Sequence, residues 1–96
     1  MPDTENSMFE YEVKNKIPLL LALSTCPRCI RMKKFLASLD VEVKVVDFDK
    51  LSLGEKKEAY RFLQPINPQL SFPTLVIGDM AVVGEDYDGV REVLDL

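Results

Sequence analysis

The sequence predicts one domain of the α/β class, in which a four-stranded mixed sheet is the middle of three layers and helices cover both of its faces. Three observations predict this class. Short apolar runs alternate along the chain with segments whose apolar residues recur at helical spacing. The first helix joins two strands, and such a crossover makes the strands parallel with a right-handed connection. The pair Gly78-Asp79 separates two further strand patterns and predicts an antiparallel hairpin.

The first predicted strand is followed directly by the first predicted helix. Residues 17–23 form a continuous apolar run, which is typical of a strand that is buried on both faces. Pro27 suits the first position of a helix, where its missing N–H is no loss, so Cys26 is expected at or beside the N-cap. An apolar stripe at positions i, i+3, i+4 and i+7 continues this helix and consists of Met32, Phe35, Leu36 and Leu39.

The rest of the chain is expected to supply three more strands and two more helices. Residues 41–45 alternate valine with charged residues, which predicts a strand with one solvent-exposed face. A helix is expected from about Glu55 and ends at a pair of prolines. Residues 74–77 and 80–83 are the strands of the hairpin, and Asp86 can cap a final helix. The predicted order is therefore strand, helix, strand, helix, strand, strand, helix.

Length and composition restrict the classes of protein that this chain can be. With 96 residues there is room for one domain, and we expect a flexible arm over residues 1–15 and a single domain over residues 16–96. Residues 9–13 of this arm alternate enough to pair with a sheet edge occasionally. A net charge of -4 argues against a nucleic-acid partner, and no apolar run approaches the ~20 residues of a membrane span. The N-terminal stretch has no secretory pattern, so we expect a cytoplasmic monomer without a membrane partner.

The two cysteines of the chain are separated by two residues, as Cys26-Pro27-Arg28-Cys29. A structural disulfide between them would close almost no loop, so the pair favours redox chemistry or metal binding. Cys26 at a helix N-terminus faces unpaired N–H groups and the positive end of the helix dipole, and Arg28 adds a cation. Both effects stabilise a thiolate, whereas Cys29, one turn later, should be more buried and less ionised. We therefore expect Cys26 to attack a substrate disulfide and Cys29 to resolve the mixed disulfide.

Other interpretations of these residues are simpler or belong to another class. A zinc site needs four ligands, and the chain has no histidine and no further cysteine, so a metal or iron–sulfur cluster carrier would need carboxylates or a second subunit. Lys33 and Lys34 are interpreted as a solvated helix face. Lys57 and Arg61 could reach a substrate carboxylate, although exposed helix charges are the simpler interpretation.

Three motifs make the sequence resemble a glutaredoxin, within the thioredoxin-like superfamily. They are the Cys26–Cys29 pair after a strand, Phe72-Pro73-Thr74 before a strand and hairpin, and Val83-Gly84-Glu85-Asp86 at the start of the last helix. The resemblance covers roughly residues 16–96. It implies a thioredoxin-like fold, a cis peptide bond before Pro73 and a dithiol–disulfide cycle with no bound cofactor. It also implies a substrate groove beside the cysteines, formed by Thr25, Arg28, Phe72, Pro73, Thr74, Gly84, Glu85 and Asp86.

Several residues differ from the pattern of glutaredoxins that use glutathione. No lysine shortly precedes Cys26, Arg28 replaces an aromatic residue, and Glu85 adds negative charge where a γ-glutamyl carboxylate would bind. Our leading hypothesis is a thiol–disulfide oxidoreductase that reduces disulfide-containing proteins, with electrons from a dedicated reductase or from glutathione. The alternatives are a glutathione-dependent monothiol thioltransferase and, from a different class, a metal or iron–sulfur cluster carrier.

Overall fold

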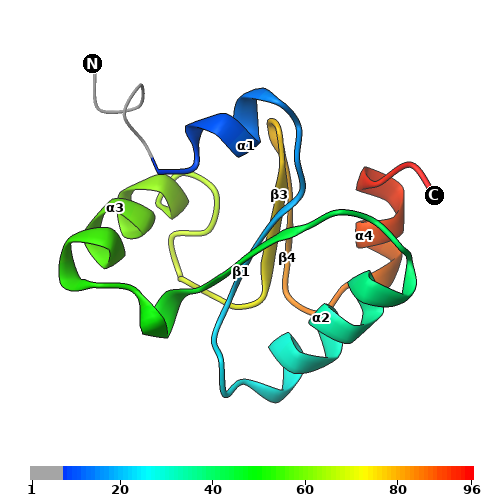
Figure 1. The fold of residues 1–96 in the computed structure, drawn as a ribbon, viewed down its shortest axis with the longest axis horizontal. Helices are drawn as coiled ribbons and strands as arrows, with labels where there is room; N and C mark the ends of the chain where they lie inside the picture. The colour runs from blue at the N-terminus through cyan, green and yellow to red at the C-terminus, as the bar shows by residue number, and fades with distance from the viewer. Residues whose placement is uncertain (1–7) are drawn as a thin grey trace.

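The computed structural model describes residues 8–96, and the centre of the fold is a four-stranded sheet in the order β2-β1-β3-β4 (Figure 1). β1 (Leu19–Ala22) and β2 (Lys44–Asp47) are parallel. β3 (Thr74–Ile77) runs antiparallel to β1, and β4 (Met80–Val83) runs antiparallel to β3. The predicted mixed sheet with its closing hairpin is therefore confirmed.

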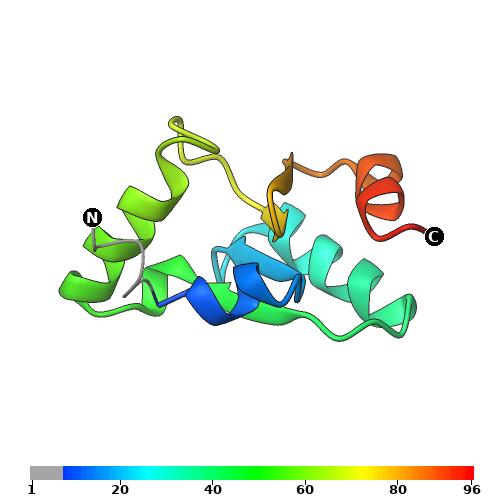
Figure 2. The same cartoon turned by 90° about the horizontal axis from the view of Figure 1, so that it is seen from above.

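Two pairs of helices lie on opposite sides of this sheet. Figure 1 shows α1 and α3 on one side and α2 and α4 on the other, and the perpendicular view in Figure 2 keeps α2 beside α4. None of the helices in residues 8–96 is long and apolar enough to cross a membrane. Three helices were predicted, and residues 8–96 contain four α-helices and a short 3-10 helix. Their bounds are α1 Glu10–Lys14, α2 Pro27–Ser38, η2 Phe48–Lys50, α3 Leu53–Leu63 and α4 Tyr87–Val93.

The core lies on both faces of the two central strands. Every residue of β1 and β3 is buried, whereas β2 and β4 each have a single buried residue. A strand covered on both faces has no polar side to present, which explains the continuous apolar run in β1. The cysteine pair follows β1 directly, so the most buried strand of the sheet positions the candidate site.

The second strand begins later than predicted and presents the opposite valine to the core. β2 begins at Lys44 instead of residue 41, and the Lys44 N–H donates to the Pro18 carbonyl at 2.8 Å. Val46, paired with Leu21, is 8% exposed, whereas Val45 is 43% exposed. A shift of one residue moves each side chain to the other face, so the alternation in residues 41–45 predicted the wrong face.

The helix that follows β2 also begins elsewhere than predicted, because its cap lies earlier. α3 starts at Leu53, two positions before Glu55. The Ser52 side chain accepts a hydrogen bond from the Glu55 N–H at 3.2 Å, and the Glu55 carboxylate accepts one from the Ser52 N–H at 2.9 Å. This is a capping box, whose Ser-x-x-Glu signature was present in the sequence.

The flexible arm that was expected over residues 1–15 differs from the structure in its second half. Residues 1–7 lie outside the described residues. α1 forms from residue 10, and Phe9, at its N-cap, is 1% exposed, with its ring 4.9 Å from that of Phe62. The Met8 N–H donates to Glu58 at 2.6 Å. Met8 and Phe9 thus contact α3, and residues 10–14 form a helix, so the expected strand-edge pairing is wrong. Burial of Phe9 outweighs the local alternation.

Candidate active site

Cys26 occupies the N-cap of α2, as the sequence predicted. Its backbone is extended (φ -83°, ψ 122°), Pro27 takes the first helical position, and the Cys26 carbonyl accepts the hydrogen bond from the Ile30 N–H at 3.0 Å. The end of β1 and a short connection over residues 23–25 hold the N-cap at the edge of the core. The Cys26 side chain is half-buried, so its sulfur is accessible at the positive end of the helix.

The surroundings of Cys26 favour its thiolate. The polar interaction of the Cys29 N–H with the Cys26 sulfur is the main reason that the pKa of Cys26 lies below its ordinary value, although the Cys26 side chain makes no capping hydrogen bond. The Cys29 side chain and the N–H and side chain of Arg28 act in the same direction, whereas burial opposes them. The Arg28 side chain is exposed and contributes from the first turn of α2. An unpaired helix N-terminus presents its N–H groups to an anion in this way.

Cys29 is more buried than Cys26, and the pKa of its thiol is shifted in the opposite direction. It is completely buried, and burial raises the pKa of its thiol to about 11. The Leu23 N–H donates to its sulfur at 3.3 Å and lowers this pKa, whereas the side chain and charge of Cys26 raise it. The two thiols are free of a disulfide in this structure. One sulfur is therefore ready to ionise at the surface, and the other is held protonated beneath it.

A carboxylate from η2 holds the segment that precedes Cys26. Asp49 accepts hydrogen bonds from the Ser24 N–H, at 2.8 Å, and from the Ser24 hydroxyl. The hydroxyl and then the N–H of Ser24 lower the pKa of Asp49 below its ordinary value. Thr25, between this tether and Cys26, is exposed. Sequence reasoning missed Asp49, because no local pattern shows that residues 24 and 49 meet.

The loop before β3 has the conformation that the resemblance implied. The Phe72–Pro73 peptide bond is cis, which confirms the expectation for Pro73. The Phe72 ring is 7% exposed and lies 5.6 Å from the ring of Phe48, centroid to centroid. The Pro73 carbonyl accepts a hydrogen bond from the Gly84 N–H at 2.7 Å. Gly84 has a φ of +89°, which favours glycine, so this residue type suits the turn that brings the two predicted site segments together.

Thr74 is placed differently from the other residues of that loop. Its side chain is completely buried, and its hydroxyl donates to the Ser71 carbonyl at 2.7 Å. The side-chain amide of Asn67, itself 4% exposed, donates to both the Thr74 hydroxyl, at 2.9 Å, and the Ser71 carbonyl, at 2.6 Å. The Thr74 side chain thus holds the loop from inside instead of lining the expected groove, and Asn67 was missed.

Glu85 does not face the site as an unpaired charge. Its carboxylate accepts two hydrogen bonds from the Arg31 guanidinium, at 2.6 and 2.8 Å, and a third from the Tyr87 hydroxyl. Arg31 and then Tyr87 lower the pKa of Glu85 to about 2. Asp86 caps α4 by accepting from the Gly89 N–H at 3.0 Å, as predicted. The sequence did not predict that Arg31 pairs with Glu85, because the two residues are 54 positions apart.

A groove rich in cations lies beside η2 and α3. It has a volume of about 450 Å³ and is lined by Phe48, Lys56, Lys57, Tyr60 and Arg61. Phe48 connects the groove to the loop of Pro73 through its contact with Phe72. The sequence pointed to two of its cations as candidates for a substrate carboxylate. The tertiary structure adds the aromatic residues and the third cation.

Within residues 8–96, no three cysteine, aspartate or glutamate side chains gather in a group that could hold a metal ion. Any cluster or zinc ion on Cys26 and Cys29 would need ligands from beyond this set of residues.

Comparisons with known proteins point to one family. The model of the glutaredoxin family matches residues 10–82. A glutaredoxin from Methanosarcina mazei is 36% identical, with a TM-score of 0.80 over 83% of this chain and 79% of that chain. Methanosarcina acetivorans methanoredoxin is 35% identical, with a TM-score of 0.78 over 82% of this chain and 84% of that chain. A glutaredoxin from Archaeoglobus fulgidus is 32% identical, with a TM-score of 0.79 over 88% and 91%. No curated protein matches.

These likenesses confirm the thioredoxin-like fold that the resemblance implied. The structures from Methanosarcina mazei and Archaeoglobus fulgidus superpose over most of both chains, and their shared architecture is the mixed sheet with helices on its two sides. The Cys26–Cys29 pair therefore lies in a thioredoxin-like fold.

Proposed function

Because the chain belongs to the glutaredoxin family, we propose that it is a cytoplasmic thiol–disulfide oxidoreductase that reduces protein disulfides through Cys26 and Cys29. The observation that carries this proposal is the contrast between the two thiols. The pKa of Cys26 is lowered chiefly by the Cys29 N–H at the N-terminus of α2, whereas burial raises that of Cys29 to about 11. A reducing compartment keeps such a pair as a dithiol between cycles.

The proposed cycle uses one thiol at a time. The Cys26 thiolate attacks a sulfur of the substrate disulfide, a mixed disulfide forms, and the first substrate thiolate leaves and takes up a proton. Cys29 then loses its proton to solvent and attacks the Cys26 sulfur, which releases the second substrate thiol. The substrate gains two electrons and the protein ends as a disulfide. No bound cofactor is needed, and a reductase or glutathione restores the dithiol.

The pH dependence of alkylation tests the contrast between the thiols. As the pH rises, Cys26 becomes a thiolate before an unstructured cysteine does, because its pKa is lowered. The rate at which iodoacetamide modifies Cys26 should therefore reach half of its maximum at a lower pH than in a short cysteine peptide. Cys29 should stay unmodified until the pH approaches 11. Mass spectrometry of wild type and Cys29→Ser identifies the modified residue, and a Cys26 midpoint at or above that of the peptide would contradict the proposal.

A glutathione-dependent thioltransferase is the second candidate, and the cationic groove is the observation that favours it. Lys56, Lys57 and Arg61 could hold the carboxylates of a small anionic thiol near the Pro73 loop. The segment that precedes α4 is less favourable, since an anion arriving there would compete with Glu85 for Arg31. The cationic groove thus favours a small anionic thiol, whereas the Arg31–Glu85 pair disfavours one. We therefore keep protein disulfides as the leading substrate class.

The variant Cys29→Ser separates the two candidates. We expect it to attack a protein disulfide once and then remain as a mixed disulfide, because no second thiol releases the substrate. Multiple-turnover reduction should be lost, and the trapped adduct should be visible by mass spectrometry. On a glutathionylated peptide, sustained release of the peptide thiol by Cys29→Ser in the presence of glutathione, with formation of glutathione disulfide, would favour the thioltransferase. Failure of both reactions in the wild type would exclude both candidates.

A further inference from the structure

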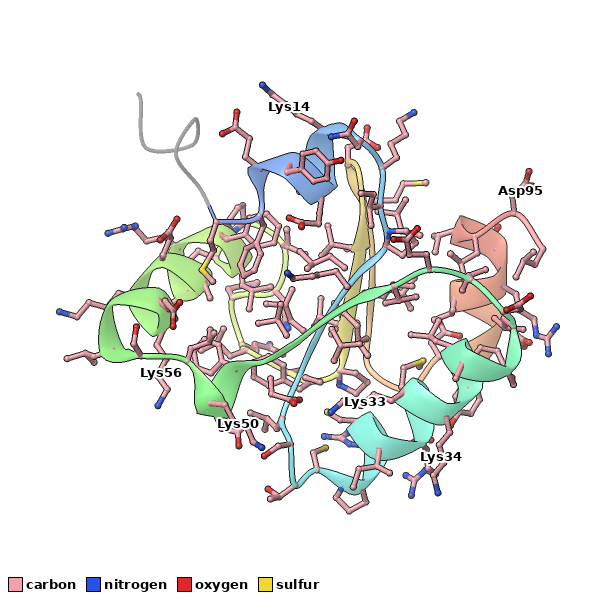
Figure 3. The ribbon with its side chains drawn as sticks, in the orientation of Figure 1. Lys14, Lys33, Lys34, Lys50, Lys56 and Asp95 are labelled. Carbon is pink, nitrogen blue, oxygen red and sulfur yellow. The ribbon has the colours of Figure 1, made fainter. Side chains whose placement is uncertain are left out.

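Lys33 lies apart from the exposed cations of α2. Its ammonium is 2.8 Å from a carboxylate oxygen of Asp47, and the two side chains are 28% and 24% exposed. Figure 3 shows Lys33 between α2 and the sheet, whereas Lys34 lies on the outer side of the same helix. The solvated helix face expected from the sequence therefore holds for Lys34 only. Because the Lys33–Asp47 pair is largely shielded from water, it is screened less than a surface ion pair.

The position of this pair relative to Cys29 follows from two elements. Lys33 is four residues after Cys29 on α2, a spacing at which side chains are neighbours on one helix face. Asp47 is the last residue of β2 and pairs with Ala22 at the end of β1. The next residue, Leu23, donates its N–H to the Cys29 sulfur. Helix and sheet thus both bring the Lys33–Asp47 pair to the buried thiol.

In the second step of the proposed cycle, the buried Cys29 must become a thiolate, so a group that stabilises its negative charge favours the reaction. Burial and the neighbouring Cys26 raise the pKa of Cys29, whereas the Leu23 N–H and the charge of Lys33 lower it. Asp47 carries the opposite charge, but its carboxylate is bonded to the Lys33 ammonium and holds that ammonium in place. Among these groups, Lys33 is the cation that favours the charged form of Cys29.

We propose that Lys33, held by Asp47, is a positioning residue that stabilises the thiolate of Cys29 while the Cys26–Cys29 disulfide closes. The inference rests on the proposed dithiol function. In this step the Cys29 proton passes to solvent, a bond forms between the two cysteine sulfurs, and the bond from Cys26 to the substrate sulfur breaks. The substrate leaves as a thiolate with the bonding pair.

The size of the effect follows from thiol reactivity. When the pKa of an attacking thiol rises by one unit, the fraction present as thiolate falls about tenfold, but the more basic thiolate is about threefold more nucleophilic. The rate of attack therefore falls roughly threefold per pKa unit. A rise of one unit in the pKa of Cys29 on loss of the charge in Lys33→Gln should therefore slow closure by about threefold. The attack by Cys26 on a substrate should be unchanged.

Reaction of the reduced protein with one equivalent of an aromatic disulfide, whose released thiolate absorbs visible light, measures the two steps separately. The first thiolate appears in a concentration-dependent phase from Cys26, and the second in a concentration-independent phase from Cys29. In Lys33→Gln only the second phase should slow, and its pH profile should move to higher pH. Lys33→Arg should restore the wild-type rate, and Lys34→Gln is the matched control.

A further variant distinguishes charge from local disruption. The double variant Lys33→Gln/Asp47→Asn removes both charges and keeps two amides that can bond, and it should be as slow as Lys33→Gln. A return to the wild-type rate would show that an unpaired Asp47 caused the loss, and would overturn the role of Lys33. An unchanged second phase in Lys33→Gln, or equal slowing in Lys34→Gln, would overturn it as well. Release of only one thiolate by the wild type would instead contradict the dithiol function itself.

Discussion

Replacing Cys26 by serine is expected to reduce disulfide exchange to the uncatalysed rate. The nucleophile is the thiolate of Cys26, and a serine hydroxyl stays protonated at neutral pH even at a helix N-terminus. Cys29 does not substitute for it, because that thiol is completely buried and its pKa is raised to about 11. The measurement is the rate at which reduced protein opens a disulfide-bonded peptide carrying a fluorophore and a quencher on either side of the bond.

The control for this prediction is the stability of the variant itself. Cys26 is the N-cap of α2, and serine is among the residues that cap helices best. Cys26→Ser should therefore unfold in urea at the same concentration as the wild type or at a higher one. A folded Cys26→Ser variant that still opens the peptide disulfide at the wild-type rate would place the nucleophile elsewhere.

Replacing Phe9 by alanine is expected to destabilise the protein by about 3–5 kcal/mol, the usual cost of removing a buried aromatic side chain. Phe9 is 1% exposed, and its ring lies 4.9 Å from that of Phe62 on α3. A domain of this size has roughly 5–15 kcal/mol of total stability, so the loss would be large. Equilibrium unfolding in urea, followed by circular dichroism, measures the change in the free energy of unfolding.

Tyr11 is the matched control for Phe9. It belongs to the same short helix, and its side chain is 67% exposed. Tyr11→Ala should change the free energy of unfolding by no more than about 0.5 kcal/mol, as is usual for surface positions. If Phe9→Ala were equally mild, α1 would contribute little to the stability of the domain, and the first 15 residues would behave as the sequence alone suggested.

Local patterns in the sequence predicted most of the elements that frame the site. Pro27 determined the start of α2 and with it the N-cap position of Cys26. The pair Gly78-Asp79 predicted the hairpin of β3 and β4, and Asp86 predicted the start of α4. Each of these signals acts over a few residues, through a cap, a fixed φ or a tight turn. These signals can be recognised in the sequence because their physical cause is local.

Local patterns could not predict the contacts between segments that are distant in the sequence. The tether of Ser24 by Asp49 joins residues 25 positions apart, and Arg31 meets Glu85 across 54 positions. The face of β2 was also mispredicted, because its register is set by pairing with β1. A sequence shows which groups can pair, but their partners are selected only when the chain packs.

By itself, the sequence determined the α/β class, the dithiol motif and the exposure of Cys26 at a helix start. It also predicted that Cys29 is more buried and less ionised than Cys26, and only the tertiary structure decided what buries Cys29 and which charges lie near it. Cys29 is buried because α2 packs against the end of β1, and its nearby charge comes from Lys33, which Asp47 of β2 holds in place. A helix terminus is a local feature, so its effect on Cys26 could be predicted. Burial and partly shielded charges depend on which surfaces meet, and three separate elements meet at Cys29.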